Sequence, residues 1–206
     1  MTDFASVLKS LPKYHRRPPR EVPAAELAAK AEAMARRGYR HTEKSLEILE
    51  AYLQGYGVLI SGGLGSGKSF FFETVEPEPI WQLSFNVCHL WKYDQLDEWF
   101  ESTVNRDVVL DDIGWDADKS NNYGTKFEVL QIALDERLRQ SGRTHITTNL
   151  TNDELIGKYD PHLIDRIYQL CKCFTLPQCE SHRDAFPNWR YVENLKRARE
   201  MGKEEL

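Results

Sequence analysis

The chain has 206 residues, of which 41% are hydrophobic and 29% are charged, and this length suits one domain with an appendage better than two full domains. Its longest uninterrupted hydrophobic runs are three residues, whereas a membrane helix needs about twenty. The N-terminus has no apolar stretch of signal-peptide length. Four cysteines are too few for a disulfide scaffold. We therefore expect a cytoplasmic protein that does not cross a membrane.

Charge is distributed unevenly along the chain. The net charge is −5, but residues 1–45 carry ten Lys and Arg against five Asp and Glu, a local balance of +5. Residues 1–23 contain four prolines, which favour irregular structure. We expect a basic N-terminal arm and helix over residues 1–40 and a compact domain over residues 41–206. The arm suits nucleic acid or an acidic protein partner, or is a solvated tail.

The hydrophobic pattern predicts two leading helices, at 24–37 and from the N-cap residue Thr42 to Gly55, the second with Leu46, Leu49 and Leu53 on one face. Strands are expected at 58–61, 81–88, 107–111, 144–148 and 171–176. Further helices are expected at 68–74, 93–102, 126–140, 153–159, 163–169 and 189–201. This alternation is typical of an α/β domain with a mostly parallel sheet. Helix 126–140 is predicted to bury Phe127, Leu130, Leu134 and Leu138.

Residues 62–69 match the phosphate-loop pattern G-x-x-x-x-G-K-[ST] and lie between a predicted strand and a predicted helix. Glycines let backbone amides turn toward phosphate oxygens, and a helix N-terminus favours the same anion. Lys68 is expected to reach the β and γ phosphates of a nucleotide, and the Ser69 hydroxyl to ligate Mg2+. The predicted nucleotide-binding residues are Gly62, Gly63, Leu64, Gly65, Ser66, Gly67, Lys68 and Ser69.

Polar residues end the next two core strands. Asp111 and Asp112 follow an apolar run at the Walker B position of a phosphate-loop protein. Adjacent carboxylates repel unless a cation lies between them, so Asp111 is predicted to hold Mg2+ and Asp112 to act as general base toward water. Asn149 ends the strand at 144–148 and is expected to sense the γ-phosphate. An acidic turn and a polar strand cap are the structural alternatives.

The ordered motifs resemble the AAA+ ATPases of the DnaC/IstB group over residues 45–183. "VVLDDIG" at 108–114 looks like the Walker B of that group, and the stretch at 134–155 is similar to its segment through sensor 1. "HLIDRIYQL" at 162–170 looks like box VII, and "ESHR" at 180–183 is similar to the Ser-x-Arg ending of the group. The resemblance implies an AAA+ P-loop NTPase fold: a five-stranded parallel sheet flanked by helices, a short basic helical leader and a reduced lid.

The resemblance also implies roles for two arginines. Arg166 matches the arginine finger that one subunit inserts into the nucleotide site of its neighbour, and Arg183 matches a sensor arginine that contacts the phosphates. Both also fit surface salt bridges. His162 stands where loaders of this group often have another arginine. The short interval between Lys68 and Asp111 leaves little room for the helical insertion of helicase loaders.

The expected function is ATP binding and hydrolysis, with Mg2+, by a homo-oligomer that loads a replicative helicase on single-stranded DNA. A transposition helper of the IstB type, a small-molecule P-loop kinase and an ATP-controlled binding switch are the alternatives. The aromatic residues Trp91, Tyr93 and Trp99 fit a hydrophobic core better than a DNA-stacking surface, because acidic residues surround them. The spacing of Cys171, Cys173, Cys179 and His182 favours core thiols over zinc.

Overall fold

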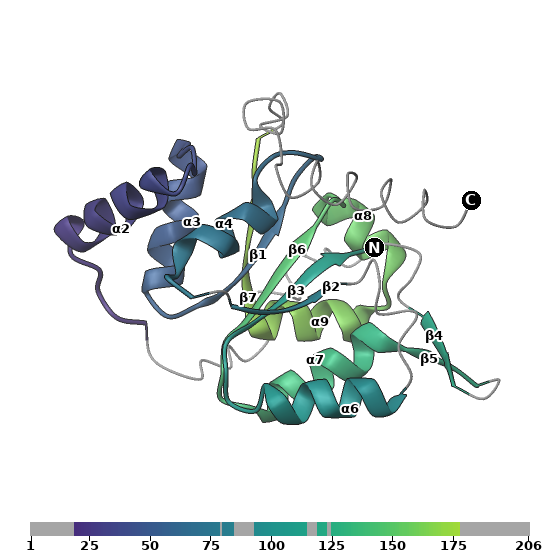
Figure 1. Ribbon diagram of the computed structural model, residues 1–206. Helices are drawn as coiled ribbons and strands as arrows, with labels where there is room; N and C mark the ends of the chain where they lie inside the picture. The colour runs from purple at the N-terminus through teal and green to yellow at the C-terminus, as the bar shows by residue number, and fades with distance from the viewer. Residues whose placement is uncertain (1–18, 79, 85–92, 115–118, 123–124, 178–206) are drawn as a thin grey trace, which may run out of the picture.

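A computed structural model describes residues 19–78, 80–84, 93–114, 119–122 and 125–177. Its main sheet has five strands in the order β2 (Trp81–Ser84), β3 (Val108–Ile113), β6 (Thr144–Thr148), β1 (Gly57–Ser61) and β7 (Cys171–Thr175) (Figure 1). All neighbouring strands are parallel. The predicted fold class is confirmed as an α/β domain built on a five-stranded parallel sheet flanked by helices, and its AAA+ type stays a prediction.

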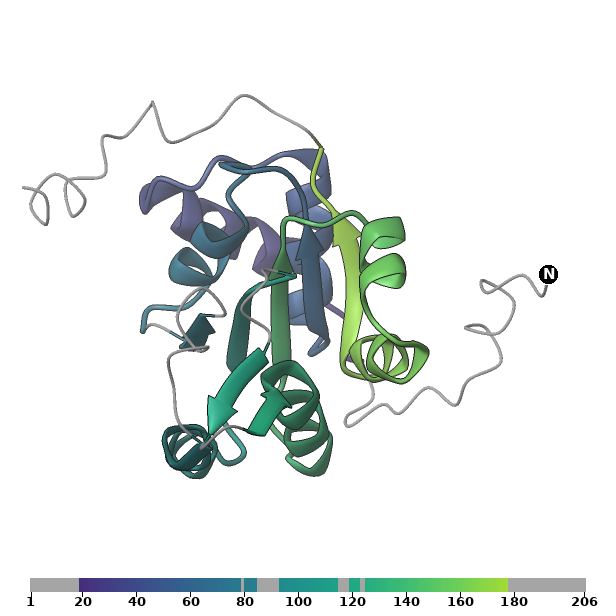
Figure 2. The same cartoon turned by 90° about the vertical axis from the view of Figure 1, so that its right-hand side faces the viewer.

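Helices cover both faces of the sheet, so the domain has three layers (Figure 2). The first face packs against α2 (Ala24–Arg36), α3 (Glu43–Leu53) and α4 (Lys68–Val75). The opposite face packs against α6 (Tyr93–Ser102), α7 (Val129–Arg139), α8 (Asn152–Lys158) and α9 (Pro161–Leu170). Successive strand residues point to opposite faces, so β1 sends Val58 and Ile60 to the first layer and Leu59 to the second. Burial on both sides explains the apolar strands.

The start of α3 follows the prediction, whereas its buried face differs. Thr42 is the N-cap, and its Oγ1 accepts a 3.1 Å hydrogen bond from the amide of Ser45. The predicted stripe was wrong at Leu46, which is exposed. Leu49 is buried as predicted, together with Ile48 and Tyr52, because the three-then-four spacing that faces the sheet runs from Ser45 through Ile48 to Tyr52.

Helix α2 packs on the rest of the described chain. Met34 is fully buried with residues of α3 and α4, and Lys30 forms a 3.0 Å ion pair with Glu76 after α4. The helix expected within the basic leader therefore contacts the domain through an apolar side chain and a charged one. The boundary at residue 40 stays a prediction.

The prediction for the helix at 126–140 was wrong at its start. Residues 125–128 form strand β5 (Thr125–Glu128), which pairs with β4 (Lys119–Asn122) in an antiparallel ribbon near α7 (Figure 1). Phe127 lies opposite Ser120 in this ribbon and so belongs to no helix face. The helical spacing of the apolar residues extended the prediction into a segment whose backbone pairs with a neighbouring strand instead.

Arg137 occupies a position on α7 that the apolar spacing did not identify. Its side chain is fully buried. The guanidinium donates to Thr144 Oγ1 at 3.1 Å, to the Gln140 side chain, and to the carbonyl oxygens of Thr103 at 3.2 Å, Arg106 at 2.6 Å and Arg143 at 3.2 Å. This arginine therefore joins α7 to the segment after α6 and to the start of β6.

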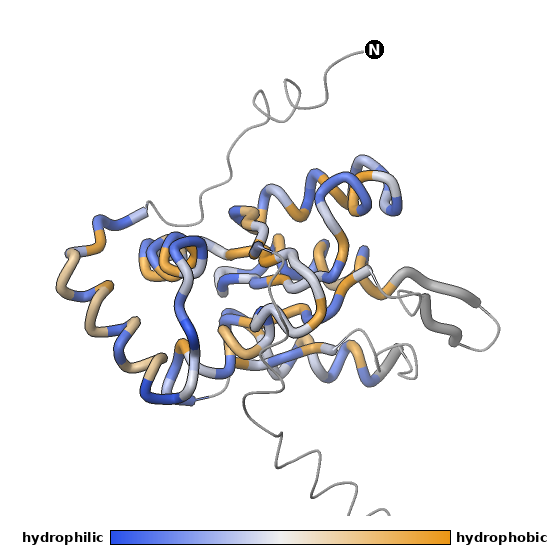
Figure 3. Tube along the Cα trace, turned by 90° about the horizontal axis from the view of Figure 1, so that it is seen from above, coloured by the Kyte–Doolittle hydropathy of each residue, from blue (hydrophilic) through white to orange (hydrophobic). Residues whose placement is uncertain are grey.

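Figure 3 shows hydrophobic residues recurring between hydrophilic ones along the helices. This is the amphipathic pattern of helices that pack on a sheet. Among the described residues, no helix is long and apolar enough to span a bilayer. The helix expected at 189–201 lies outside the described residues, as do residues 85–88 of the strand expected at 81–88.

Candidate functional site

The phosphate loop joins the end of β1 to the start of α4. Three of its glycines have positive φ: Gly62 at 155°, Gly65 at 78° and Gly67 at 90°. Gly67 is the N-cap of α4 in the left-handed conformation, which glycine adopts without strain. Helix α4 then begins at Lys68, and its first amides have no acceptor within the helix. The loop therefore ends in backbone donors at the positive end of a helix dipole.

Lys68 lies across the loop with its ammonium group buried against oxygen acceptors. Nζ donates to the carbonyl oxygens of Gly62 at 2.8 Å and Gly63 at 2.9 Å. It also donates to Asn149 Oδ1 at 2.8 Å. Only 5% of the residue is exposed. Because parallel strands present their carboxyl ends at one edge, the end of β6 lies next to the loop that follows β1.

Ser69 and Asp111 form the second contact between the loop and the sheet. Ser69 Oγ donates to Asp111 Oδ1 at 2.8 Å, and Thr147 Oγ1 donates to the same oxygen at 2.6 Å. Asp111 is buried, and it ends the apolar run of β3. The hydroxyl and the carboxylate that the sequence assigned to magnesium are therefore adjacent in space.

Asp112 turns toward Asn149. Its φ is 58°, a left-handed conformation that few residues other than glycine adopt. Asn149 Nδ2 donates to Asp112 Oδ1 at 3.2 Å. A hydrogen-bonded chain therefore runs from Lys68 through the side-chain amide of Asn149 to Asp112. All three of these predicted catalytic residues lie together.

Two other loop residues differ in their exposure. Ser66 is 9% exposed, and its Oγ has no hydrogen-bond partner within the described part of the chain. A Cβ atom added to Gly62 would lie 3.1 Å from this oxygen, so the two residues face each other across a tight turn. Leu64 is 70% exposed at the tip of the loop. The loop thus holds an orphaned polar atom beneath an exposed tip.

Arg166 lies on α9 and contacts residues of α7 and of α9 itself. Its guanidinium forms an ion pair with Asp135 of α7, and Nη1 donates to the carbonyl oxygen of His162 at 3.3 Å. These two contacts of Arg166 lie on α7 and α9, away from the phosphate loop. Arg183 lies outside the described residues.

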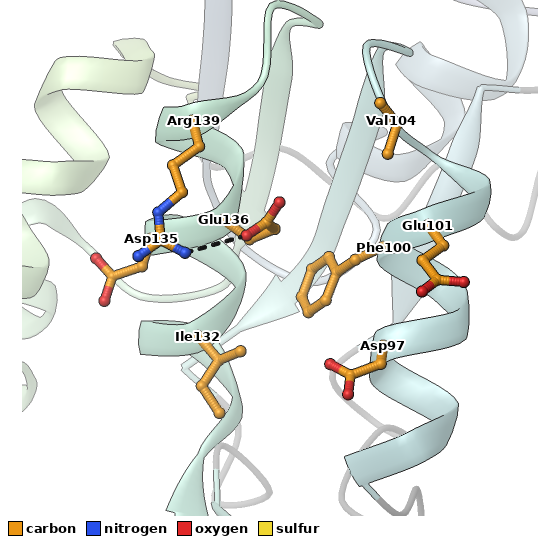
Figure 4. A pocket seen from close by; sticks show the side chains of 8 residues that line it. All are labelled: Asp97, Phe100, Glu101, Val104, Ile132, Asp135, Glu136 and Arg139. Carbon is orange, nitrogen blue, oxygen red and sulfur yellow. Dashed lines mark hydrogen bonds and ion pairs between the residues drawn. The ribbon is translucent and has the colours of Figure 1, made fainter.

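Asp135 also lines a hollow of about 420 Å³ between α6 and α7 (Figure 4). The lining is apolar at its centre and acidic at its rim. It consists of Asp97, Phe100, Glu101, Val104, Ile132, Asp135, Glu136 and Arg139. None of these residues belongs to the phosphate loop, and the sequence patterns did not predict a hollow at this place.

Trp99 and Cys171 lie in the core, and Cys173 packs against it. Trp99 is buried, with its ring centroid 5.3 Å from that of Phe100 at an edge-on angle of 76°. Cys171 Sγ donates to the carbonyl oxygen of Thr144 at 3.2 Å, and burial raises the pKa of the Cys173 thiol to about 12. Trp91, Cys179 and His182 lie outside the described residues.

His145, on β6, is a buried titratable residue that the sequence patterns did not identify. Its ring lies between Tyr52 and Phe72, with centroid distances of 5.1 Å to each. Nδ1 accepts a hydrogen bond from the amide of Val58 at 3.3 Å. Burial and the nearby charge of Arg143 lower the pKa of His145 to about 3. The residue is therefore neutral in the folded protein at neutral pH.

No family model and no curated protein matches the chain. Similar solved structures include the DnaC helicase loader (14% identity, TM-score 0.46), with 79% of this chain and 96% of that chain covered. DnaI is 18% identical, with a TM-score of 0.45 and coverage of 84% and 95%. AMPPCP-bound DnaA from Aquifex aeolicus is 15% identical, with a TM-score of 0.49 and coverage of 71% and 51%.

Proposed function

We propose that the chain binds ATP with Mg2+ and hydrolyses it at the phosphate loop. The observation that carries the proposal is the hydrogen-bonded chain from Lys68 through Asn149 to Asp112, beside the contact of Ser69 with Asp111. One cation, one neutral amide and two carboxylates thereby meet at the carboxyl edge of a parallel sheet. Such edges are where α/β proteins bind their ligands.

The residues present fit a triphosphate. The loop glycines and the first turn of α4 supply backbone donors, and Lys68 supplies a cation that is already desolvated. Ser66 Oγ is buried without a partner in the described part of the chain, and a phosphate oxygen would satisfy it. Lys68 would exchange the carbonyl oxygens of Gly62 and Gly63 for phosphate oxygens, because both are neutral acceptors that an anion outcompetes.

The residues also fit a magnesium ion. Among the described residues, no group of three or more His, Cys, Asp or Glu side chains could hold a metal. Magnesium in nucleotide sites is held by one or two protein oxygens together with phosphate oxygens and water, and Ser69 and Asp111 provide such a pair. When bound, Mg2+ neutralises charge that develops on the transferring phosphate.

Hydrolysis needs a group that accepts a proton from water. Asp112 is the candidate, since its carboxylate lies at the end of β3 next to Asp111. The 3.2 Å hydrogen bond from Asn149 fixes one oxygen of the Asp112 carboxylate. The position of the other oxygen follows from the same side-chain rotamer. Asn149 therefore orients the base on one side and Lys68 on the other, and it adds no charge to the site.

The proposal extends to an assembly. Arg166 is proposed as a finger that enters the nucleotide site of a neighbouring copy, since its contacts in its own chain lie on α7 and α9. An arginine supplied from outside the site raises rates by about three to five powers of ten in well-studied NTPases. Before it can act in this way, the ion pair with Asp135 must open. Arg183 stays proposed as a phosphate sensor.

The biological role that we propose is loading of a replicative helicase in DNA replication, on single-stranded DNA. It is supported by the resemblance at 108–114, 134–155 and 162–170 to the DnaC/IstB group. Association with a hexameric replicative helicase in the presence of a slowly hydrolysed ATP analogue is the expected result. Association with a transposase, or transfer of phosphate to a small acceptor, would replace this role with one of the two alternatives.

Nucleotide binding is tested directly by titrating a fluorescent ATP analogue into the purified chain. We expect saturable binding that Lys68→Ala weakens at least about 100-fold, because a desolvated charge-assisted contact with phosphate is lost. Lys44→Ala is the matched control, since this lysine lies at the surface and pairs with Glu47. Equal affinity for both variants would exclude the phosphate loop as the binding site.

A further inference from the structure

Strand β3 is irregular next to its two carboxylates. Leu110 pairs with Ile146, and Ile113 pairs with Thr148, so β3 advances three residues where β6 advances two. The extra residue falls at Asp111 and Asp112, opposite Thr147. A bulge of this kind changes the direction of the side chains at a strand end and is common beside active sites.

The hydroxyl of Thr147 forms hydrogen bonds to β3 at the point where the regular pairing of β3 with β6 is interrupted. Thr147 Oγ1 accepts a 2.9 Å hydrogen bond from the amide of Asp112 and donates a 2.6 Å bond to Asp111 Oδ1. The residue is fully buried in the described structure. One hydroxyl therefore contacts both residues of the bulge, one through its backbone and the other through its carboxylate.

These two contacts have different consequences. The bond to the amide supports the left-handed conformation of Asp112, at φ 58°, which directs its side chain to Asn149. The bond to Asp111 joins that of Ser69 on the same oxygen. The other carboxylate oxygen, Oδ2, accepts no hydrogen bond in the described part of the chain. Thr147 thus fixes the rotamer of Asp111 with one oxygen engaged and one left over.

We infer that Thr147 is a positioning residue for the carboxylate pair: its hydroxyl sets Asp111 for magnesium and Asp112 for water. The inference rests on the proposed ATP and Mg2+ site. The Thr147 hydroxyl carries no charge, so it acts on both residues through geometry. Loss of the hydroxyl should therefore weaken the response to Mg2+ more than the binding of the nucleotide itself.

The test measures how the affinity for a fluorescent ATP analogue depends on Mg2+ concentration. In Thr147→Val the side chain keeps its shape and loses the hydroxyl. We expect the Mg2+ concentration for half-maximal enhancement of binding to rise about 10-fold or more, the usual effect of removing a group that orients a metal ligand. Binding in EDTA should stay within about 2-fold of the wild type, and Thr147→Ser should restore the response to Mg2+.

Thr148→Val is the matched control. This neighbour also loses a buried hydroxyl, which donates to the carbonyl oxygen of Ile113 at 2.8 Å and accepts from the amide of Leu150 at 3.1 Å. It contacts neither carboxylate side chain, so a purely structural loss in β6 should appear in both valine variants. We expect the Mg2+ response to change in Thr147→Val alone, at comparable melting temperatures.

Two results would overturn the inference. A Mg2+ response in Thr147→Val equal to that of the wild type would show that the hydroxyl does not position Asp111. Wild-type protein that binds nucleotide with no Mg2+ dependence, or binds none, would instead contradict the proposed site itself. If Thr147→Val unfolds, Thr147→Ala and Thr147→Ser give the same comparison of a side chain without and with the hydroxyl.

Discussion

Lys68 and Asn149 are 81 positions apart in the chain, yet Lys68 Nζ donates a 2.8 Å hydrogen bond to Asn149 Oδ1. The amide nitrogen of the same asparagine donates to Asp112. Asn149 therefore connects the residue proposed to bind phosphate with the residue proposed to activate water. The side chain of Asn149 accepts a hydrogen bond at Oδ1 and donates one at Nδ2. An amide can do both, whereas a carboxylate can only accept.

Asn149→Ala should separate nucleotide binding from hydrolysis. In the nucleotide-free variant the carbonyl oxygens of Gly62 and Gly63 still hold Lys68 in the loop, so affinity for an ATP analogue should change by less than about 3-fold. Hydrolysis should fall about 100-fold, because Asp112 loses its orienting partner. Analogue titration and phosphate release measure the two effects. Asn152→Ala, at the exposed start of α8, is the control. Parallel losses of affinity and rate in Asn149→Ala would contradict the assigned role.

Arg166→Ala should leave nucleotide binding intact and remove hydrolysis in an assembly of copies. When Arg166→Ala is mixed with Lys68→Ala, some interfaces combine an intact loop with an intact arginine, and partial hydrolysis should return. Phosphate release across a range of mixing ratios measures this recovery. Activity that stays at the background level at every ratio would remove the finger assignment.

Asp135→Asn tests the pair that holds Arg166 in its own chain. The variant loses the charge that engages the guanidinium while it keeps the size of the side chain. If the ion pair competes with insertion into a neighbour, hydrolysis should become half-maximal at a lower protein concentration than in the wild type. A shift toward higher concentration would show that Asp135 supports the active position of Arg166. The measurement is the ATPase rate as a function of protein concentration.

Arg137→Met should destabilise the fold without direct effect on the site. The change removes all hydrogen bonds of the buried guanidinium, including the one to the Arg106 carbonyl oxygen, while the carbonyl oxygens of Thr103 and Arg143 keep a backbone amide donor each. We expect the free energy of unfolding to fall by about 3 kcal/mol or more. Urea denaturation measures the loss. Arg139→Met, on the same helix with a largely exposed side chain, should change stability by less than about 0.5 kcal/mol. Similar denaturation midpoints for the two variants would contradict the stabilising role of Arg137.

The buried His145 should make the free energy of unfolding depend on pH. Its pKa is lowered to about 3 in the folded protein, against about 6.5 in an unfolded chain, so between these values the unfolded state binds a proton that the native state does not. The free energy of unfolding should therefore fall as pH falls below about 6.5, by up to about 1.4 kcal/mol per pH unit from this residue. His145→Leu should flatten the slope between pH 6.5 and 5. Identical slopes in urea denaturation would exclude His145 as its source.

The sequence was sufficient for the sheet and for the residues that the structure brings together at the candidate site, because both depend on local patterns. Short runs of apolar and β-branched residues located β1, β3, β6 and β7 to within one or two residues at each end. The phosphate-loop pattern and the polar strand ends identified Lys68, Asp111 and Asn149, and parallel strands bring such ends to one edge.

Other features depend on the tertiary structure and left no local signal. The buried guanidinium of Arg137 looks like a surface arginine in the sequence, since its acceptors are carbonyl oxygens from other segments. Phe127 has helical spacing but pairs in β5 with a strand that the sequence did not reveal. The hydroxyl of Thr147 gains its role only from a bulge in the neighbouring strand. Its residue type alone indicated a β-strand and nothing more.

Phosphate release from ATP is the most direct test of the proposal that the chain hydrolyses ATP with Asp112 as general base. It is to be made with Mg2+ at protein concentrations that permit assembly, with and without single-stranded DNA, on the wild type, Asp112→Asn and the exposed control Asp153→Asn. We predict hydrolysis by the wild type and the control, and a rate at least about 100-fold lower in Asp112→Asn with analogue binding retained. Hydrolysis by Asp112→Asn at the wild-type rate, or wild-type release no faster than that of Lys68→Ala, would contradict it.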